Sequence, residues 1–127
     1  MKKADLYLRF EIDPVAKGRP RFTRAGIAYK PKKTRDFENE IRFIAMNQYG
    51  GSLVDGPIKV QINFNFKPGK TVKRKHHTTR PDCSNLAKGV EDALNGVVWK
   101  DDSQIIDLRV VKQYALESFI EVFIKSV

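Results

Sequence analysis

The stretch Ile58-Lys59-Val60-Gln61-Ile62-Asn63-Phe64-Asn65-Phe66 decides the fold of this chain. Apolar residues occupy every second position, so a β-strand would place them on one face and the polar residues between them on the other. Pro57, directly before the stretch, marks its start. A strand of this kind needs a layer of helices against its apolar face and leaves its polar face open.

Two other segments have the spacing of amphipathic helices. Apolar residues recur at helical intervals along 37–45 and again along 86–97. Thr34 is expected to be the N-cap of the first helix, and Gly50-Gly51 its end. Asn95-Gly96 is expected to end the second helix.

The remaining strands surround these elements. Alternating residues predict a strand over 6–12, and two more over 105–114 and 119–124, with a short hairpin around Gly26. The order β-α-β-α-β-β predicts an α+β fold, a two-layer sandwich in which two helices cover a four-stranded mixed sheet. A chain of 127 residues is expected to form a single domain over 1–127. The open face or an edge of the sheet is then available for a second copy or a ligand.

The charge of the chain points to a polyanionic partner. The net charge is +9. The segments 17–35 and 67–80 hold 14 of the 24 lysine and arginine residues, and neither segment contains an acidic residue. Each segment precedes a predicted helix, so we expect the two to form a single basic rim that neutralises phosphates. Nucleic acid is the first expectation, an anionic membrane surface the second, and a basic protein without such a partner the alternative. The cations expected to contact DNA are Lys17, Arg19, Arg21, Arg24, Lys73, Arg74, Lys75 and Arg80.

Two aromatic residues lie among these cations. Phe22 and Tyr29 have the ring faces on which unpaired bases stack. The preferred interpretation from sequence is that each packs within its own loop. His76 and His77 lie in the second segment, and the sequence assigns them no role.

Nothing in the sequence predicts a membrane-bound or secreted protein. No apolar run approaches the roughly 18 residues of a membrane span, and the N-terminal residues lack the pattern of a signal peptide. Cys83 is the single cysteine, so neither an internal disulfide nor a cysteine-based zinc site is expected. A cytoplasmic location is expected.

Acidic residues cluster at the two ends of the second predicted helix. Asp82 precedes the helix, and Asp101-Asp102 follows it in a turn. Carboxylates are the ligands that Mg²⁺ prefers, and such a cluster inside a basic protein suggests a metal site that meets a polyanion. In the alternative interpretation, Asp82 is a helix N-cap, Asp101-Asp102 belongs to an ordinary turn, and Glu91 and Asp92 form a solvated helix face.

Lys88 lies on the same helical face as Ser84 and Asn85. We expect it to reach back toward the helix N-terminus, where phosphates bind well. The alternative is a surface lysine whose stem lies along the protein.

These motifs resemble the RusA family of Holliday junction resolvases, small endodeoxyribonucleases encoded by phages and prophages. The resemblance is strongest over 80–112. It rests on Pro81-Asp82-x-x-Asn85-Leu86-x-Lys88, Asp92-Ala93-Leu94-Asn95-Gly96, Trp99-x-Asp101-Asp102-x-Gln104-Ile105 and, more weakly, Lys17-Gly18-Arg19-Pro20-Arg21 and Thr34-Arg35-Asp36-Phe37-Glu38.

The resemblance implies a homodimer that binds four-way DNA junctions and nicks two strands symmetrically with Mg²⁺, for which Mn²⁺ is expected to substitute. The essential acids of the family fall on Asp82 and Asp102, and its functional lysine falls on Lys88. Asp101 is expected to assist in holding the metal. The family's first motif is Asp-x-Asp-Asn, and its second aspartate falls on Ser84.

Ser84 is therefore a departure from the family pattern. Its hydroxyl would be a neutral and weaker ligand, or would hold a water on the metal. Asp92 or Asp101 is a candidate to compensate, whereas the neighbouring Cys83 is discounted because Mg²⁺ is a poor partner for thiolate. A module that binds junctions or other nucleic acid without cleaving them is the second hypothesis. A basic phage structural protein, with the acids as turn residues, is the third.

Overall fold

The computed structural model describes residues 5–127, so residues 1–4, which belong to the stretch inspected for a signal peptide, lie outside it. Four strands form one sheet in the order β1-β6-β4-β5. They are β1 (Asp5–Phe10), β4 (Ile58–Phe66), β5 (Ile105–Tyr114) and β6 (Phe119–Ser126). The β1–β6 and β6–β4 pairs are antiparallel and β4–β5 is parallel, which confirms the predicted mixed sheet.

The alternating stretch forms β4, which lies between β6 and β5. Its residues Ile58, Val60, Ile62 and Phe64 are buried against the helical layer. The register pairs Val60 with Ile124 of β6, so apolar side chains of neighbouring strands line the same face. β4 decides the fold because it pairs on both sides with long strands, β5 and β6, that lie far from it in the sequence.

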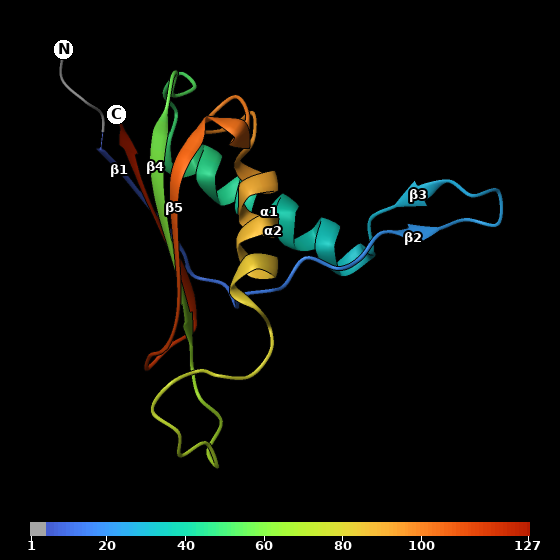
Figure 1. Ribbon diagram of the computed structural model, residues 1–127, viewed down its shortest axis with the longest axis vertical. Helices are drawn as coiled ribbons and strands as arrows, with labels where there is room; N and C mark the ends of the chain where they lie inside the picture. Colours follow the sequence, from blue (N-terminus) through green and yellow to red (C-terminus); the bar gives the residue numbers. More distant parts are fainter. Residues whose placement is uncertain (1–4) are drawn as a thin grey trace.

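Two helices, α1 (Lys32–Gln48) and α2 (Cys83–Leu94), lie together on one face of the sheet (Figure 1). Their fully buried side chains include Ile41 on α1 and Leu86 and Val90 on α2. The predicted α+β two-layer arrangement is therefore confirmed. Within residues 5–127, no helix has the length and apolar character that crossing a membrane requires.

The expected N-cap of the first helix is wrong. The helix begins at Lys32 with Pro31 as its N-cap residue, three positions before the predicted N-cap. Thr34 lies inside the helix, is buried, and its Oγ1 accepts a hydrogen bond of 2.9 Å from the Gly18 N–H. The hydroxyl therefore holds the incoming basic segment against α1 and does not cap the helix.

The two basic segments project from the body in different directions (Figure 1). The first contains the predicted hairpin, made of β2 (Arg21–Phe22) and β3 (Ala28–Tyr29), which extends outward beyond the start of α1. Gly26 has a φ of 81° in its turn, a conformation that glycine adopts easily. The second segment, which connects the end of β4 to the start of α2, loops out beyond both. The expected single rim is therefore wrong, because the segments form two separate projections.

Candidate active site

One face of α2 is polar while the other is buried in the core. Ser84, Lys88 and Asp92 are spaced four residues apart, so they lie above one another along the helix. The side chain of Asp92 is only 18% exposed, and Glu91 is half-buried. The interpretation of Glu91 and Asp92 as a solvated face is therefore wrong.

A buried tryptophan places the turn that follows α2. Trp99 is 0% exposed, and its Nε1–H donates a hydrogen bond of 2.6 Å to Asn95 Oδ1. The Asn95 side chain in turn donates from Nδ2 to Asp102 Oδ2 at 3.3 Å. Gly96 has a φ of 79°, which lets the chain reverse directly after the helix. The position of Asp102 is thus fixed from the core outward.

Gln104 fastens the same turn at its other end. Its Oε1 accepts hydrogen bonds from the backbone N–H groups of Lys100 and Asp101, at 2.8 and 3.0 Å. Its Nε2 donates to the carbonyls of Val54 and Gly56, at 3.0 and 2.9 Å. Asp101 caps the short 3₁₀ helix η1 (Asp102–Gln104) by accepting from the Ser103 N–H at 3.1 Å. One amide side chain therefore ties the acidic turn to the segment that precedes β4.

Replacing Gln104 by alanine is expected to destabilise the fold by about 2 to 3 kcal/mol, because four hydrogen bonds are lost and two carbonyls lose their donor. The DNA cleavage that the family resemblance implies should fall as well in the folded fraction, because Asp102 loses its support. Urea unfolding and a cleavage assay measure the two effects. Gln113→Ala is the matched control, since it removes one hydrogen bond to Asn65 and should leave cleavage intact. Full activity in Gln104→Ala would show that the turn holds Asp102 without it.

Lys88 lies between two carboxylates. Its Nζ is 3.2 Å from Asp92 Oδ1 and 3.4 Å from Asp102 Oδ2. The second oxygen of Asp92 binds Nζ of Lys17, which comes from the first basic segment. The expectation that Lys88 reaches back toward the start of α2 is wrong, because its ammonium lies toward the end of the helix. The four-residue spacing of Lys88 and Asp92 was visible in the sequence, whereas the Lys17–Asp92 contact was not.

The charges of this cluster reinforce one another. The pKa of Lys88 is raised above its ordinary value, chiefly by the hydrogen bond with Asp92, so its ammonium is held protonated. Burial raises the pKa of Asp92, but the hydrogen bonds from Lys17 and Lys88 outweigh it and the net shift is downward. The pKa of Glu91 is raised, first by burial and then by the charge of Asp102. The arrangement therefore presents a permanent cation beside the ionised Asp92.

Asp82 lies at the opposite end of α2 from the acidic turn. It is the N-cap residue, as the alternative interpretation expected, yet its side chain makes no capping hydrogen bond. Lys88 is six residues further on, about 9 Å along the helix axis. Within residues 5–127, no three His, Cys, Asp or Glu side chains gather closely enough to hold a metal ion. The structure thus joins Lys88 to Asp102, and it leaves Asp82 at the exposed start of α2.

The second basic segment is anchored just before Asp82. Nζ of Lys112, on β5, donates to the carbonyls of Thr79 and Pro81 at 2.8 and 2.9 Å. The ring of His77 lies between Phe66 and Tyr114, with centroids 4.3 and 5.2 Å away. These contacts join the segment to the ends of β4 and β5 and so fix where α2 begins.

This anchor is expected to weaken in mild acid. Burial and, to a smaller extent, the charge of Lys112 lower the pKa of His77 below 6.5. The unfolded chain therefore binds more protons than the folded chain between the two pKa values, and stability falls as the pH drops below about 6.5. The protection factors for amide exchange over 67–80, which correct for the slower intrinsic exchange in acid, should fall several-fold between pH 7.5 and pH 5.5. His77→Phe should remove this dependence, while the same change at exposed His76 should keep it; unchanged protection factors in the parent protein would contradict the prediction.

The remaining cations expected to contact DNA are exposed on the two projections. Arg19, Arg21 and Arg24 lie on or beside the β2–β3 hairpin, and the second segment carries Lys73, Arg74, Lys75 and Arg80. Lys17 differs, because it is half-buried and paired with Asp92. It therefore connects the first basic segment to the acidic cluster.

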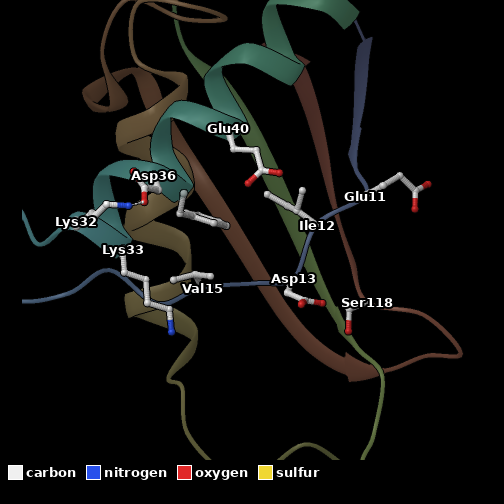
Figure 2. A pocket seen from close by; sticks show the side chains of 10 residues that line it. Glu11, Ile12, Asp13, Val15, Lys32, Lys33, Asp36, Glu40 and Ser118 are labelled. Atoms are coloured by element: carbon white, nitrogen blue, oxygen red, sulfur yellow. Dashed lines mark hydrogen bonds and ion pairs between the residues drawn. The ribbon is translucent and has the colours of Figure 1, made fainter.

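A large hollow lies away from these residues. It has a volume of about 750 Å³ and lies between the β1–α1 connection and the first turns of α1 (Figure 2). Asp13 and Glu40 border it, and Lys32 is paired there with Asp36 at 2.7 Å. None of the residues expected to hold a metal lines it. The residues that the sequence marked as a candidate site therefore lie outside this hollow.

Comparisons with known proteins show the family to which this chain belongs. A family model described as "Endodeoxyribonuclease RusA" matches residues 11–125. The chain is 35% identical over 130 residues to the "Uncharacterized protein YqaN" of Bacillus subtilis (strain 168), covering 91% of this chain and 92% of that protein. It is 32% identical over 97 residues to the "Crossover junction endodeoxyribonuclease RusA" of Shigella sonnei (strain Ss046), covering 76% of this chain and 67% of that protein. The chain therefore belongs to the RusA family of endodeoxyribonucleases, as its motifs indicated.

Proposed function

We propose that this chain is a Mg²⁺-dependent Holliday junction resolvase, active as a homodimer in the cytoplasm during DNA recombination and repair. The observation that carries the proposal is the Lys88 ammonium held between Asp92 and Asp102, on the helix whose N-cap residue is Asp82. A fixed cation beside carboxylates suits the cleavage of a phosphodiester, because negative charge builds up on the phosphate during the reaction.

The donor atoms at this site fit Mg²⁺. The ion is usually held by one or two carboxylates, with water and substrate phosphate completing its shell, so a cluster of three acids is not required. Asp102, which is partly exposed, would hold it at the turn. Asp82, the other acid that the resemblance marks, makes no capping bond but lies at the opposite end of α2, so its carboxylate would join the same ion only if the start of α2 moves toward the turn. Ser84 would contribute its hydroxyl, and Asp101 the carboxylate oxygen that does not cap η1. When bound, the ion supplies the charge that acidifies the attacking water and polarises the phosphate.

The protein groups have separate tasks. Lys88 would donate to a non-bridging phosphate oxygen as charge develops there, and Asp92 with Lys17 would keep its side chain in place. The two basic projections would neutralise phosphates on the junction arms, so junction binding should weaken steeply as salt is added.

A dimer is supported by the form of the sheet and of the substrate. β1 and β5 are edge strands, and the face of the sheet away from the helices is open (Figure 1). Exposed apolar side chains on this side include Tyr7 and Phe123, whose rings are 5.0 Å apart. A two-fold dimer would present two sites to the two symmetric strands of a four-way junction.

The test is cleavage of a synthetic four-way junction and of a linear duplex of the same arms, with Mg²⁺, Mn²⁺ or no metal. The proposal expects symmetric nicks in the junction, with either metal and only with metal. Binding to the junction without cleavage in any divalent ion would favour the binding module, and restored cleavage in Ser84→Asp would trace the loss to that position. Equal binding to branched and linear DNA without cleavage would favour a structural protein.

A further inference from the structure

The β2–β3 hairpin carries large apolar side chains in water. Phe22 is 67% exposed, Ile27 64% and Tyr29 47%. The expectation that the two aromatic residues pack within their loop is therefore wrong. Exposing three such side chains on a projection of about nine residues is costly in water, and it suggests a partner that covers them.

The apolar side chains lie on both faces of the hairpin. Arg21 pairs with Tyr29, and Phe22 pairs with Ala28. Directly paired residues share a face and neighbouring residues alternate, so Tyr29 lies on one face and Phe22 on the other. Ile27 is two residues before Tyr29 and lies on the same face as that ring. A partner that covers both faces must surround the hairpin, so the hairpin suits insertion better than docking on a flat surface.

The hairpin is held rigid despite its exposure. At its tip, the Thr23 N–H donates to the Ile27 carbonyl at 2.9 Å, and Thr23 Oγ1 accepts from the Ile27 N–H at 3.1 Å. At its base, Lys30 Nζ is 2.7 Å from Oε1 of Glu38, whose side chain is only 4% exposed. Lys17 binds Asp92 on the other side of the base. Little ordering entropy remains to be lost when such an element inserts.

The surroundings of the hairpin favour nucleic acid as the partner. A hollow of about 380 Å³ at its base is lined in part by Arg19, Arg21 and Lys33. α1 begins beside it without a side-chain cap, so the first N–H groups of the helix add to the attraction for phosphate. Arg21 is also paired with Tyr29, and Arg24 lies in the turn at the tip, so cations and aromatic rings alternate along the hairpin and match the backbone and the bases of a DNA strand.

We propose that the β2–β3 hairpin inserts at the branch point of the DNA, where Phe22 stacks on a base on one side and Tyr29, with Ile27, contacts a base on the other. This inference rests on the proposed function, because it assumes a branched substrate. Unstacking costs less at a branch point than within a duplex arm, because the base steps there are not held by two continuous strands, and apolar side chains can enter DNA between base steps. The Lys17–Asp92 contact would then place the inserted hairpin at a fixed position relative to the acidic turn.

The test uses a four-way junction with 2-aminopurine at the crossover, a base whose fluorescence rises when it is unstacked. Binding is measured in Ca²⁺, followed by separate cleavage assays in Mg²⁺. Wild-type protein should raise the fluorescence at the crossover and leave it unchanged when the probe lies in an arm. Phe22→Ala and Tyr29→Ala should each weaken junction binding by about 5- to 100-fold relative to linear duplex and reduce the fluorescence rise.

Two controls separate stacking from general effects. Phe22→Leu keeps an apolar side chain without a ring, so it should retain part of the binding and lose most of the fluorescence rise. Phe43 is 68% exposed on α1, so Phe43→Ala removes an equally exposed ring elsewhere and should leave the fluorescence rise intact. Unfolding curves should be the same for all these variants, because the side chains are exposed.

The outcomes distinguish this inference from the proposed function. Wild-type protein that cleaves junctions but leaves the crossover base stacked would overturn the inference alone. A fluorescence rise that survives the double variant Phe22→Ala, Tyr29→Ala would do the same. In a third outcome, the wild type unstacks the crossover base, the single variants do not, and no metal gives cleavage. This result would support the inference and remove the nuclease function.

Discussion

Asp102→Asn is expected to lower junction cleavage on the order of 10³-fold while junction binding stays the same or becomes slightly tighter. The side chain belongs to the proposed metal site, and the ion is worth several kcal/mol in the transition state, at about 1.4 kcal/mol for each tenfold in rate. Removing one negative charge near the bound phosphates also removes repulsion, so affinity should not fall. The opposite directions of the two effects distinguish a lost ligand from a damaged fold.

The substitution is mild for the structure. Asparagine keeps an oxygen that can accept from Asn95 and Lys88, as Asp102 Oδ2 does at 3.3 and 3.4 Å. Asp82→Asn should give a similar loss of cleavage, because it removes the other proposed metal-binding carboxylate. It should leave the fold intact, since the Asp82 side chain makes no capping bond to α2. Asp107→Asn is the matched control, because Asp107 is an exposed aspartate on β5 outside the cluster. Cleavage near the parent rate in both Asp82→Asn and Asp102→Asn would remove the two acids from the site.

Regular periodicity made most of the fold predictable. The alternation in β4 and the helical spacing in α1 and α2 each reflect one buried face. A buried face is the feature that a local sequence pattern predicts best. The start of α1 was predicted wrongly for the opposite reason. Thr34 is a good cap by type, but its hydroxyl is used by the backbone of Gly18, sixteen residues earlier, and no local rule includes that partner.

The candidate site was predictable only where it is local. Lys88 and Asp92 are one helical turn apart, and the family resemblance marked Lys88 and Asp102. The contact of Lys17 with Asp92 spans 75 residues and depends on how the first basic segment crosses α2. The exposure of Phe22 and Tyr29 could not be predicted either, because strands of two residues are too short to show which side is buried.

Lys88→Met is expected to separate metal binding from chemistry. The Lys88 ammonium contacts Asp92 and Asp102 where a divalent ion would otherwise find two carboxylates, so it competes for Asp102. Removing it should lower the concentration of Mn²⁺ or Mg²⁺ needed for half-maximal cleavage. The maximal rate should nonetheless fall by about 10²- to 10³-fold, because the donor that meets the developing phosphate charge is gone.

Junction affinity should change much less, by less than about tenfold, because Lys88 is one cation among many on a strongly basic chain. Lys100→Met is the matched control, since Lys100 is an exposed lysine at the start of the same turn. Lys88→Arg keeps the charge but spreads it over a larger planar group, so it should recover only part of the rate. Metal titrations of all three variants, at saturating junction, give the midpoint and the maximal rate separately. A higher metal midpoint in Lys88→Met would show that Lys88 supports the metal site, and the competition inferred from its two carboxylate contacts would be wrong.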